Sequence, residues 1–206
     1  MERVDGMRIV ITGSSSGVGK SCLELLSSDH EVIGLDRASC DLSSKITRNL
    51  VPSCDILLNC AGTGVGGKID YVKHNTDDIL EIMHVNLLAP MILSQQALAQ
   101  NPNCKIVNVT STNNNRYWPN DLAYSLSKHS LSEFGRMLRV EYPESRILEI
   151  RLGLTASGFN ASRYKREPHR FAELYANNKC LMPDEVAGKI ASVLFDDTIK
   201  FLEVSP

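Results

Sequence analysis

The feature that most constrains the fold is a glycine-rich stretch between an apolar run and a helical pattern near the start of the chain. The apolar run Met7–Ile11 leads into Thr12–Gly19, and a helical stripe follows on Val18, Cys22, Leu25 and Leu26. In a strand–turn–helix unit of this kind, backbone N–H groups at the helix N-terminus can bind a pyrophosphate. The residues expected to contact such a cofactor here are Gly13, Ser15, Ser16, Gly17, Val18 and Gly19.

A second apolar run, Glu31–Leu35, ends in Asp36. An acidic side chain at this point can accept hydrogen bonds from the adenosine ribose hydroxyls, and it repels a 2′-phosphate. Arg37 is adjacent and could weaken that discrimination. The charge pattern therefore favours NAD as the cofactor, with NADP as the alternative.

Three side chains further along the chain form a pattern suited to acid–base chemistry. Tyr124 stands four residues before Lys128 and thirteen after Ser111, which ends another apolar run. Residues four apart on a helix share one face, so the phenol and the ammonium can meet at one site. A free phenol has a pKa of about 10, and a nearby ammonium lowers that pKa towards the range that general acid–base catalysis requires. The pattern predicts that Tyr124 is a proton donor, that Lys128 tunes it, and that Ser111 hydrogen-bonds a substrate oxygen.

The combined motifs resemble the short-chain dehydrogenase/reductase family. The resemblance runs from about Ile9 to Gly153, and it includes Asn59-Cys60-Ala61-Gly62 and the helix-borne Asn86. It implies a Rossmann-type fold and a secondary alcohol or ketone substrate. It also implies that Asn86 holds a water connecting Lys128 to solvent. The catalytic set implied by the resemblance is Asn86, Ser111, Tyr124 and Lys128.

The resemblance also adds cofactor contacts beyond the glycine-rich stretch. Thr155 falls where a backbone N–H would meet the nicotinamide amide, and Lys128 is expected to hold the nicotinamide ribose. The expected contacts are Asp36, Arg37, Asp41, Leu42, Asn59, Cys60, Ala61, Gly62, Tyr124, Lys128, Gly153, Thr155 and Ser157.

Two departures from the family pattern affect the expected structure. Only Arg37–Cys40 separate Asp36 from Asp41-Leu42, the pair that resembles the adenine contact of the family. A parallel crossover with a helix needs about a dozen residues, so the usual helix cannot fit there and the third strand should be vestigial. Leu152 replaces the proline of the family's Pro-Gly pair, which loosens a turn but removes no catalytic group.

Apolar runs and helical stripes alternate along the chain, which predicts an α/β fold. We expect a doubly wound, mainly parallel sheet of six to seven strands in one domain spanning residues 1–206, with a substrate-covering segment at about 154–180. The expected strands are Arg8–Thr12, Glu31–Leu35, Ile56–Cys60, Lys105–Val109, Ile147–Leu152 and Lys200–Val204. The expected helices include a short one on Leu42, Ile46 and Leu50, a long one from Thr76 through Asn86 towards Ala99, and one carrying Tyr124 and Lys128.

Composition narrows the classes of protein. The chain has 206 residues, 43% of them hydrophobic, and a net charge of −2, which gives no electrostatic reason to expect nucleic acid or membrane partners. It shows neither a signal-like apolar core at its start nor a run of roughly 20 apolar residues, so we expect a cytoplasmic enzyme. Six cysteines without a C-x-x-C pair should be reduced, and five scattered histidines predict no metal site. The family resemblance implies a homodimer or homotetramer.

Three alternative functions are compatible with parts of the sequence. Ser14–Ser21 nearly satisfies the P-loop pattern of nucleoside triphosphatases, but no expected later strand ends in the aspartate that would hold magnesium. A non-catalytic NAD-binding sensor on the same fold and an epimerase or dehydratase stay open, although a sensor would not need Ser111, Tyr124 and Lys128 together. A basic cluster at residues 163–170 most often forms a solvated helix face, and it leaves an anionic substrate open.

Overall fold

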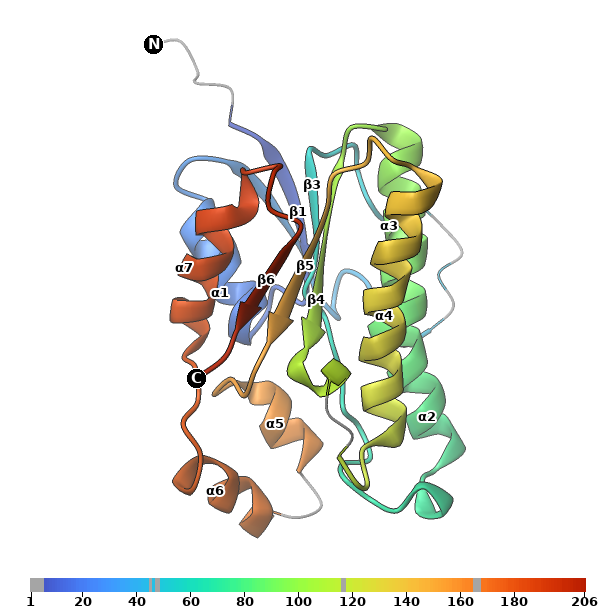
Figure 1. The fold of residues 1–206 in the computed structure, drawn as a ribbon, viewed down its shortest axis with the longest axis vertical. Helices are drawn as coiled ribbons and strands as arrows, with labels where there is room; N and C mark the ends of the chain where they lie inside the picture. The colour runs from blue at the N-terminus through green and yellow to red at the C-terminus, as the bar shows by residue number, and fades with distance from the viewer. Residues whose placement is uncertain (1–5, 45, 47–48, 116–117, 165–167) are drawn as a thin grey trace.

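The computed structural model describes residues 6–44, 46, 49–115, 118–164 and 168–206. Its centre is a six-stranded, entirely parallel sheet in the order β2-β1-β3-β4-β5-β6 (Figure 1). The strands are β1 (Arg8–Thr12), β2 (Glu31–Leu35), β3 (Ile56–Asn59), β4 (Lys105–Ser111), β5 (Ile147–Leu152) and β6 (Phe201–Val204). The predicted doubly wound α/β fold is confirmed, with six strands among the described residues.

Helices cover both faces of the sheet (Figure 1). One face carries α1 (Gly17–Leu26) and α7 (Pro183–Leu194), and the other carries α2 (Thr76–Met83), α3 (Ala89–Gln100) and α4 (Leu122–Glu141). The short helices α5 (Gly158–Arg163) and α6 (Pro168–Ala176) lie beyond the carboxyl ends of the strands (Figure 1). The described residues also include two 3-10 turns, Tyr71–Lys73 and Thr112–Asn115.

The central strands β1, β3, β4 and β5 are buried at nearly every position, and most of their buried side chains are apolar. Along β1, Ile9 and Ile11 pack into the core beneath α1 and α7, whereas Val10 packs into the core beneath α3. This alternation is the period of two that a strand imposes on its side chains. Near-continuous apolar runs are therefore typical of parallel strands covered by helices.

The long helix expected from Thr76 is interrupted by a π-helical turn, His84–Leu88, between α2 and α3. Such turns widen a helix by one residue, and they occur frequently at functional sites. Asn86 lies on this turn and is fully buried.

The short helix predicted on Leu42, Ile46 and Leu50 is wrong for the described residues, which form turns and irregular backbone. The side chain of Gln96 on α3 accepts hydrogen bonds from the backbone N–H groups of Leu50 (2.8 Å) and Val51 (3.3 Å). A helix this short is costly to nucleate, and the contacts with α3 satisfy the backbone without it. The vestigial third strand stays a prediction, because residues 45, 47 and 48 lie outside the described residues.

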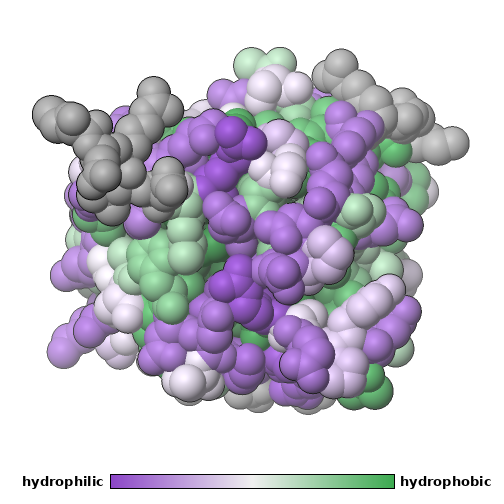
Figure 2. Space-filling view, turned by 90° about the horizontal axis from the view of Figure 1, so that it is seen from above, coloured by the Kyte–Doolittle hydropathy of each residue, from purple (hydrophilic) through white to green (hydrophobic). Residues whose placement is uncertain are grey.

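The face at the amino ends of the strands is largely hydrophilic, with apolar patches between the polar groups (Figure 2). At the opposite end, the strand order reverses between β1 and β3, and this is where open α/β sheets bind ligands. Across the described part of the chain, no helix combines the length and the apolar character needed to cross a membrane.

Candidate active site

A cavity of about 1110 Å³ lies at the carboxyl ends of the strands, between the glycine-rich turn, the end of β4, α4 and α5. It is lined by every predicted site residue except Asn59 and Asn86. The predicted residues that line it are Gly13, Ser15, Ser16, Gly17, Val18, Gly19, Asp36, Arg37, Asp41, Leu42, Cys60, Ala61, Gly62, Ser111, Tyr124, Lys128, Gly153, Thr155 and Ser157.

The glycine-rich turn is packed too tightly for side chains at two of its positions. A Cβ on Gly13, whose φ is +72°, would lie 2.8 Å from the Cα of Ala61, and a Cβ on Gly19 would lie 2.3 Å from the carbonyl oxygen of Gly13. The N-cap of α1, Ser16, makes no side-chain capping hydrogen bond, and the first turn carries no acidic residue. Backbone N–H groups at this helix end therefore suit an anion.

Asp36 organises the turn that follows β2. Its Oδ1 accepts hydrogen bonds from the backbone N–H groups of Ala38 (3.1 Å) and Ser39 (2.9 Å) and from the Ser39 hydroxyl (3.0 Å). The bonds from Ser39 and Ala38 lower the pKa of the Asp36 carboxyl. The cavity wall at this point therefore carries a negative charge at neutral pH.

The neighbouring residues complete this part of the wall. The exposed guanidinium of Arg37 lies 3.6 Å from the carboxylate of Glu81 on α2. Asp41 accepts hydrogen bonds from the backbone N–H (3.0 Å) and the hydroxyl (2.7 Å) of Ser43, which lower the pKa of its carboxyl. Leu42 is buried beside it. Two carboxylates thus border the cavity within one short turn region.

Asn59 faces the interior instead of the cavity. Its side chain is 1% exposed, and its Nδ2 donates hydrogen bonds to Asn108 Oδ1 (2.9 Å) and Ser94 Oγ (3.3 Å). The segment after it is held by Thr12, whose Oγ1 accepts hydrogen bonds from the backbone N–H groups of Cys60 and Ala61, both at 3.0 Å. Thr12 fixes the distance between the glycine-rich turn and this segment.

Asn86 connects two walls of the site from behind. Its Oδ1 accepts a hydrogen bond from the Thr63 backbone N–H (2.8 Å), and its Nδ2 donates to the Thr63 carbonyl (2.9 Å) and to Ser127 Oγ (3.0 Å). Both amide protons are therefore engaged by the segment after β3 and by α4. The side chain is a positioning group in this structure, and its link to a water stays a proposal.

Lys128 is almost completely buried, and its Nζ donates a hydrogen bond to the carbonyl of Val109 on β4 (2.9 Å). Burial lowers the pKa of this ammonium to about 8, and the neighbouring Cys60 opposes part of that shift. The side chain therefore carries its positive charge at neutral pH but is close to losing it.

Burial raises the pKa of the Tyr124 phenol, so the tyrosine is protonated at neutral pH. Arg163 and Ser111 lower this pKa, and Asp121 raises it further. The guanidinium carbon of Arg163 lies 4.5 Å from the centre of the Tyr124 ring. Arg163 from α5 is therefore a cation that lowers the pKa of the phenol in this structure, and the tuning of Tyr124 by Lys128 stays a prediction.

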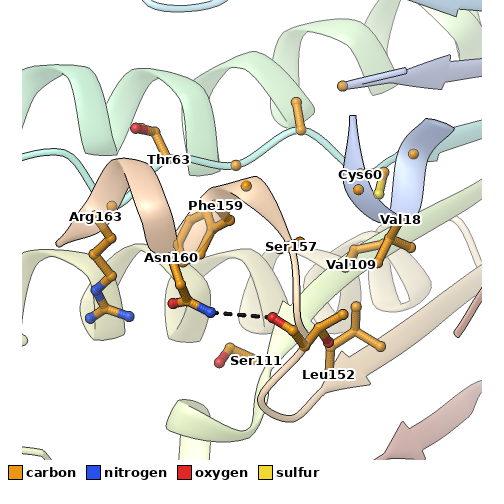
Figure 3. A pocket seen from close by; sticks show the side chains of 18 of the residues that line it. Val18, Cys60, Thr63, Val109, Ser111, Leu152, Ser157, Phe159, Asn160 and Arg163 are labelled. Atoms are coloured by element: carbon orange, nitrogen blue, oxygen red, sulfur yellow. Dashed lines mark hydrogen bonds between the residues drawn. The ribbon is translucent and has the colours of Figure 1, made fainter. Parts of the chain in front are cut away.

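Arg163 was not among the predicted site residues, because it belongs to a basic cluster that resembles a solvated helix face. It is 8% exposed, and it lines the cavity together with Phe159 and Asn160 from the same helix (Figure 3). Asn160 donates a hydrogen bond to the carbonyl of Thr155 (3.3 Å), which closes the turn before α5. Only its basic character was visible in the sequence, and its burial depends on how α5 docks.

The chain is similar to known dehydrogenases over nearly its whole length. The NADP-dependent 3-hydroxy acid dehydrogenase of Schizosaccharomyces pombe is 25% identical over 98% of this chain and 94% of that protein. The dehydrogenase/reductase SDR family member 11 of Gallus gallus is 23% identical over 94% of this chain and 92% of that protein.

Solved structures share the fold. A mutant of 4-hydroxyisoleucine dehydrogenase complexed with NADH and succinate superposes with a TM-score of 0.79, at 22% identity and covering 96% of each chain. Serine dehydrogenase complexed with NADP+ gives 0.77, at 19% identity over 96% of this chain and 94% of that one. The model of the family described as short chain dehydrogenase matches residues 38–168, more than half of the chain. The protein therefore belongs to the short chain dehydrogenase family.

Proposed function

We propose that this oxidoreductase transfers a hydride between NAD(H) and a secondary alcohol or its ketone, using Ser111, Tyr124 and Lys128. The observation that carries the proposal is that these three side chains line the same cavity as the glycine-rich turn and Asp36. A dinucleotide site and an acid–base site at the two ends of one cavity suit hydride transfer.

The residues present fit a nicotinamide dinucleotide. The crowding at Gly13 and Gly19 is the kind of close backbone packing that lets a pyrophosphate approach a helix N-terminus. Asp36 would accept the ribose hydroxyls, and the Asp41-Leu42 pair would border the adenine. When bound, the cofactor supplies or accepts the hydride.

The side chains at the other end of the cavity supply the proton chemistry. In the reduction direction, Tyr124 is protonated because its phenol is buried, and it donates this proton to the substrate oxygen. The hydroxyl of Ser111 hydrogen-bonds the same oxygen and gains strength as negative charge develops there. The ammonium of Lys128 holds the nicotinamide ribose and keeps a positive charge near the reacting groups.

The choice between the two dinucleotides follows from the charges at the adenosine end. The similar proteins include one named as NADP-dependent and one bound to NADH, so the preference of this chain rests on its own residues. The ionised Asp36 would repel a 2′-phosphate, and the Arg37 guanidinium is directed to Glu81. We therefore propose NAD(H) as the cofactor.

Fluorescence titration of the protein with NADH and with NADPH tests this preference. NADH should bind at least about fivefold more tightly, since the repulsion of a phosphate by a carboxylate is worth roughly 1 kcal/mol or more. The matched variant Asp36→Ser should bind NADPH more tightly than the natural chain does. Equal or tighter NADPH binding by the natural chain would remove the role of Asp36 and point to Arg37.

The reaction itself is tested with NADH and a panel of polar ketones, following the loss of reduced nicotinamide. Turnover should appear with some member of the panel and should disappear with Tyr124→Phe, whose ring still packs. If NADH binds but no ketone in a broad panel is reduced, and no alcohol is oxidised with NAD+, the non-catalytic sensor becomes the better account.

A further inference from the structure

Arg163 joins three segments that meet above Tyr124. It ends α5 in the segment that covers the cavity, and it contacts the loop after β3 as well as the start of α4. A Cβ on Gly64 would come within 3.1 Å of the Arg163 side chain, and a Cβ on Gly67 would come within 2.8 Å of the Arg163 carbonyl oxygen. The loop after β3 therefore packs closely against the arginine.

The guanidinium is anchored by a buried carboxylate. Arg163 Nη2 pairs with Asp121 Oδ1, and Asp121 is 2% exposed. The other oxygen of Asp121 accepts a hydrogen bond from Asn113 Nδ2 (2.8 Å) and lies 4.0 Å from Lys68 Nζ. Asp121 is the N-cap residue of α4, yet its side chain makes no capping hydrogen bond. An aspartate at this position ordinarily caps the helix, so here its carboxylate is diverted to hold Arg163.

The anchored guanidinium lies against aromatic faces. Its carbon is 4.5 Å from the centre of the Tyr124 ring and 5.9 Å from that of Phe159, and the two rings are 5.5 Å apart. Arg163 Nε is buried without a hydrogen-bond partner among the described residues. A cation over an aromatic face is attracted to the ring, and this attraction grows when the ring is desolvated or becomes negative.

From this arrangement we propose that Arg163 is a positioning residue of the catalytic site: held by Asp121, its guanidinium orients the Tyr124 ring and stabilises the phenolate while the covering segment lies over the cavity. The proposal rests on the assignment of Tyr124 as the proton donor. The cation that stabilises the phenolate comes from α5, in the segment that covers the cavity. The pKa of Tyr124 therefore depends on whether α5 is packed over the cavity.

Other charged groups lie around the same phenol, and they determine whether each substitution should raise or lower the pKa of Tyr124. Asp121 opposes the phenolate from the start of α4, and Lys68 lies beyond it on the loop. Lys128 lies one turn along α4, bonded to the Val109 carbonyl, with Cys60 beside it. Arg163 is the first of the charged groups to lower the pKa of Tyr124. Removing Arg163 should therefore raise that pKa, and removing the charge of Asp121 should lower it.

The experiment measures the phenol directly and needs no substrate. The full chain is produced with 3-fluorotyrosine, and its ¹⁹F NMR spectrum is followed against pH; the signal of residue 124 among six tyrosines is assigned with Tyr124→Phe. In Arg163→Met the apparent pKa of this signal should rise by roughly one unit. In Arg163→Lys, which keeps the charge, most of the rise should be absent.

Two further variants distinguish an electrostatic effect of Arg163 on Tyr124 from a purely structural role. Asp121→Asn breaks the same ion pair, but it should shift the pKa of the 124 signal downwards. A purely structural ion pair would make Asp121→Asn and Arg163→Met shift it in the same direction, and that result overturns the proposal. Arg136→Met, which removes an exposed arginine of α4 paired with Glu133, should leave the signal unchanged.

The outcomes also separate this inference from the proposed function. If Arg163→Met melts well below the natural chain, the other two variants provide the test. Arg163→Lys should leave the pKa of Tyr124 nearly unchanged, and Asp121→Asn should lower it. An unchanged pKa in a folded Arg163→Met protein contradicts the inference even if the enzyme is active. Failure to find a turned-over substrate contradicts the proposed function and leaves the measured shift standing. Where turnover is found, the same upward shift should appear in the pH profile of alcohol oxidation.

Discussion

A buried lysine at each end of the sheet differs in whether a carboxylate pairs with it. At the amino end of β4, Lys105 is 1% exposed, pairs with Asp197 at 3.1 Å and donates a hydrogen bond to the Asp196 carbonyl at 2.9 Å. At the carboxyl end of the same strand, Lys128 donates to the Val109 carbonyl, and among the described residues no carboxylate pairs with it. A buried charge without a counter-ion costs stability. The contrast indicates that the carboxyl end is organised for ligands and the amino end for stability.

The rest of the amino end follows the same rule. Arg146 donates hydrogen bonds to the carbonyls of Asn103 (2.6 and 2.9 Å) and Asp55 (3.3 Å), and it pairs with Asp197 at 3.2 Å. Arg8 pairs with Glu31 at 2.9 Å. At the cavity, by contrast, backbone crowding, a helix N-terminus without a side-chain cap and a buried phenol occur together. Features that cost stability gather where a function can use them.

The largest change expected from a single methyl group is at the glycine-rich turn. In Gly19→Ala the new Cβ would lie 2.3 Å from the Gly13 carbonyl oxygen, so the turn must move. The free energy of unfolding should fall by about 3 kcal/mol, and NADH binding should be lost.

A matched glycine in α7, the helix that packs beside α1 on the same face of the sheet, provides the control. A Cβ on Gly188, within α7, would meet no heavy atom within 4 Å. Gly188→Ala should therefore raise the free energy of unfolding by about 0.5–1 kcal/mol and leave NADH binding intact. Denaturant titration and fluorescence measure both quantities. Equal effects of the two alanines would show that the turn is not constrained as described.

Lys128→Met should stabilise the protein while impairing its chemistry. The pKa of Lys128 falls from 10.5 to about 8 on folding, so the unfolded chain binds the proton more tightly. The penalty is complete below pH 8 and fades as the pH rises to about 10.5. At pH 7 the variant should gain about 1–3 kcal/mol, because the shift is worth about 3 kcal/mol and the lost hydrogen bond offsets part of it. Denaturant titrations from pH 7 to 10.5 should show this gain shrinking, and a gain that is constant with pH would contradict the assignment.

Lys105→Met should change the free energy of unfolding in the direction opposite to Lys128→Met. This substitution removes an ion pair with a half-exposed Asp197 and a hydrogen bond to the Asp196 carbonyl, so the free energy of unfolding should fall by about 1–2 kcal/mol. NADH affinity should not change, because the residue lies at the far end of β4 from the cavity. Stabilisation by Lys105→Met would remove the distinction between the two ends.

The strands could be predicted because burial on both faces leaves apolar runs that local sequence reveals. The ranges expected for β1, β2 and β5 are those of the structure. The presence of Tyr124 and Lys128 at one cavity was likewise predictable, since helical spacing alone places them on one face of α4. In both cases the decisive contacts are close in sequence or follow from a simple period.

Arg163 and Asp121 could not be predicted, because they are 42 positions apart and meet only when α5 docks on α4. In the sequence, Arg163 is one of several basic residues, and nothing marks it as the buried one. The helix predicted around Leu50 was wrong for a related reason, because the backbone there hydrogen-bonds the side chain of Gln96 on α3. Long-range side-chain contacts of this kind overrule local helical periodicity.

The most direct test of the account compares Tyr124→Phe with Lys128→Met for both NADH affinity and turnover. Tyr124→Phe removes only the hydroxyl, so NADH affinity should stay within about twofold while turnover falls by about 10²–10⁴. Lys128→Met should weaken both, because its ammonium is assigned to the ribose as well as to the reacting groups. If Tyr124→Phe retains near-normal turnover, the tyrosine is not the proton donor and the central claim fails.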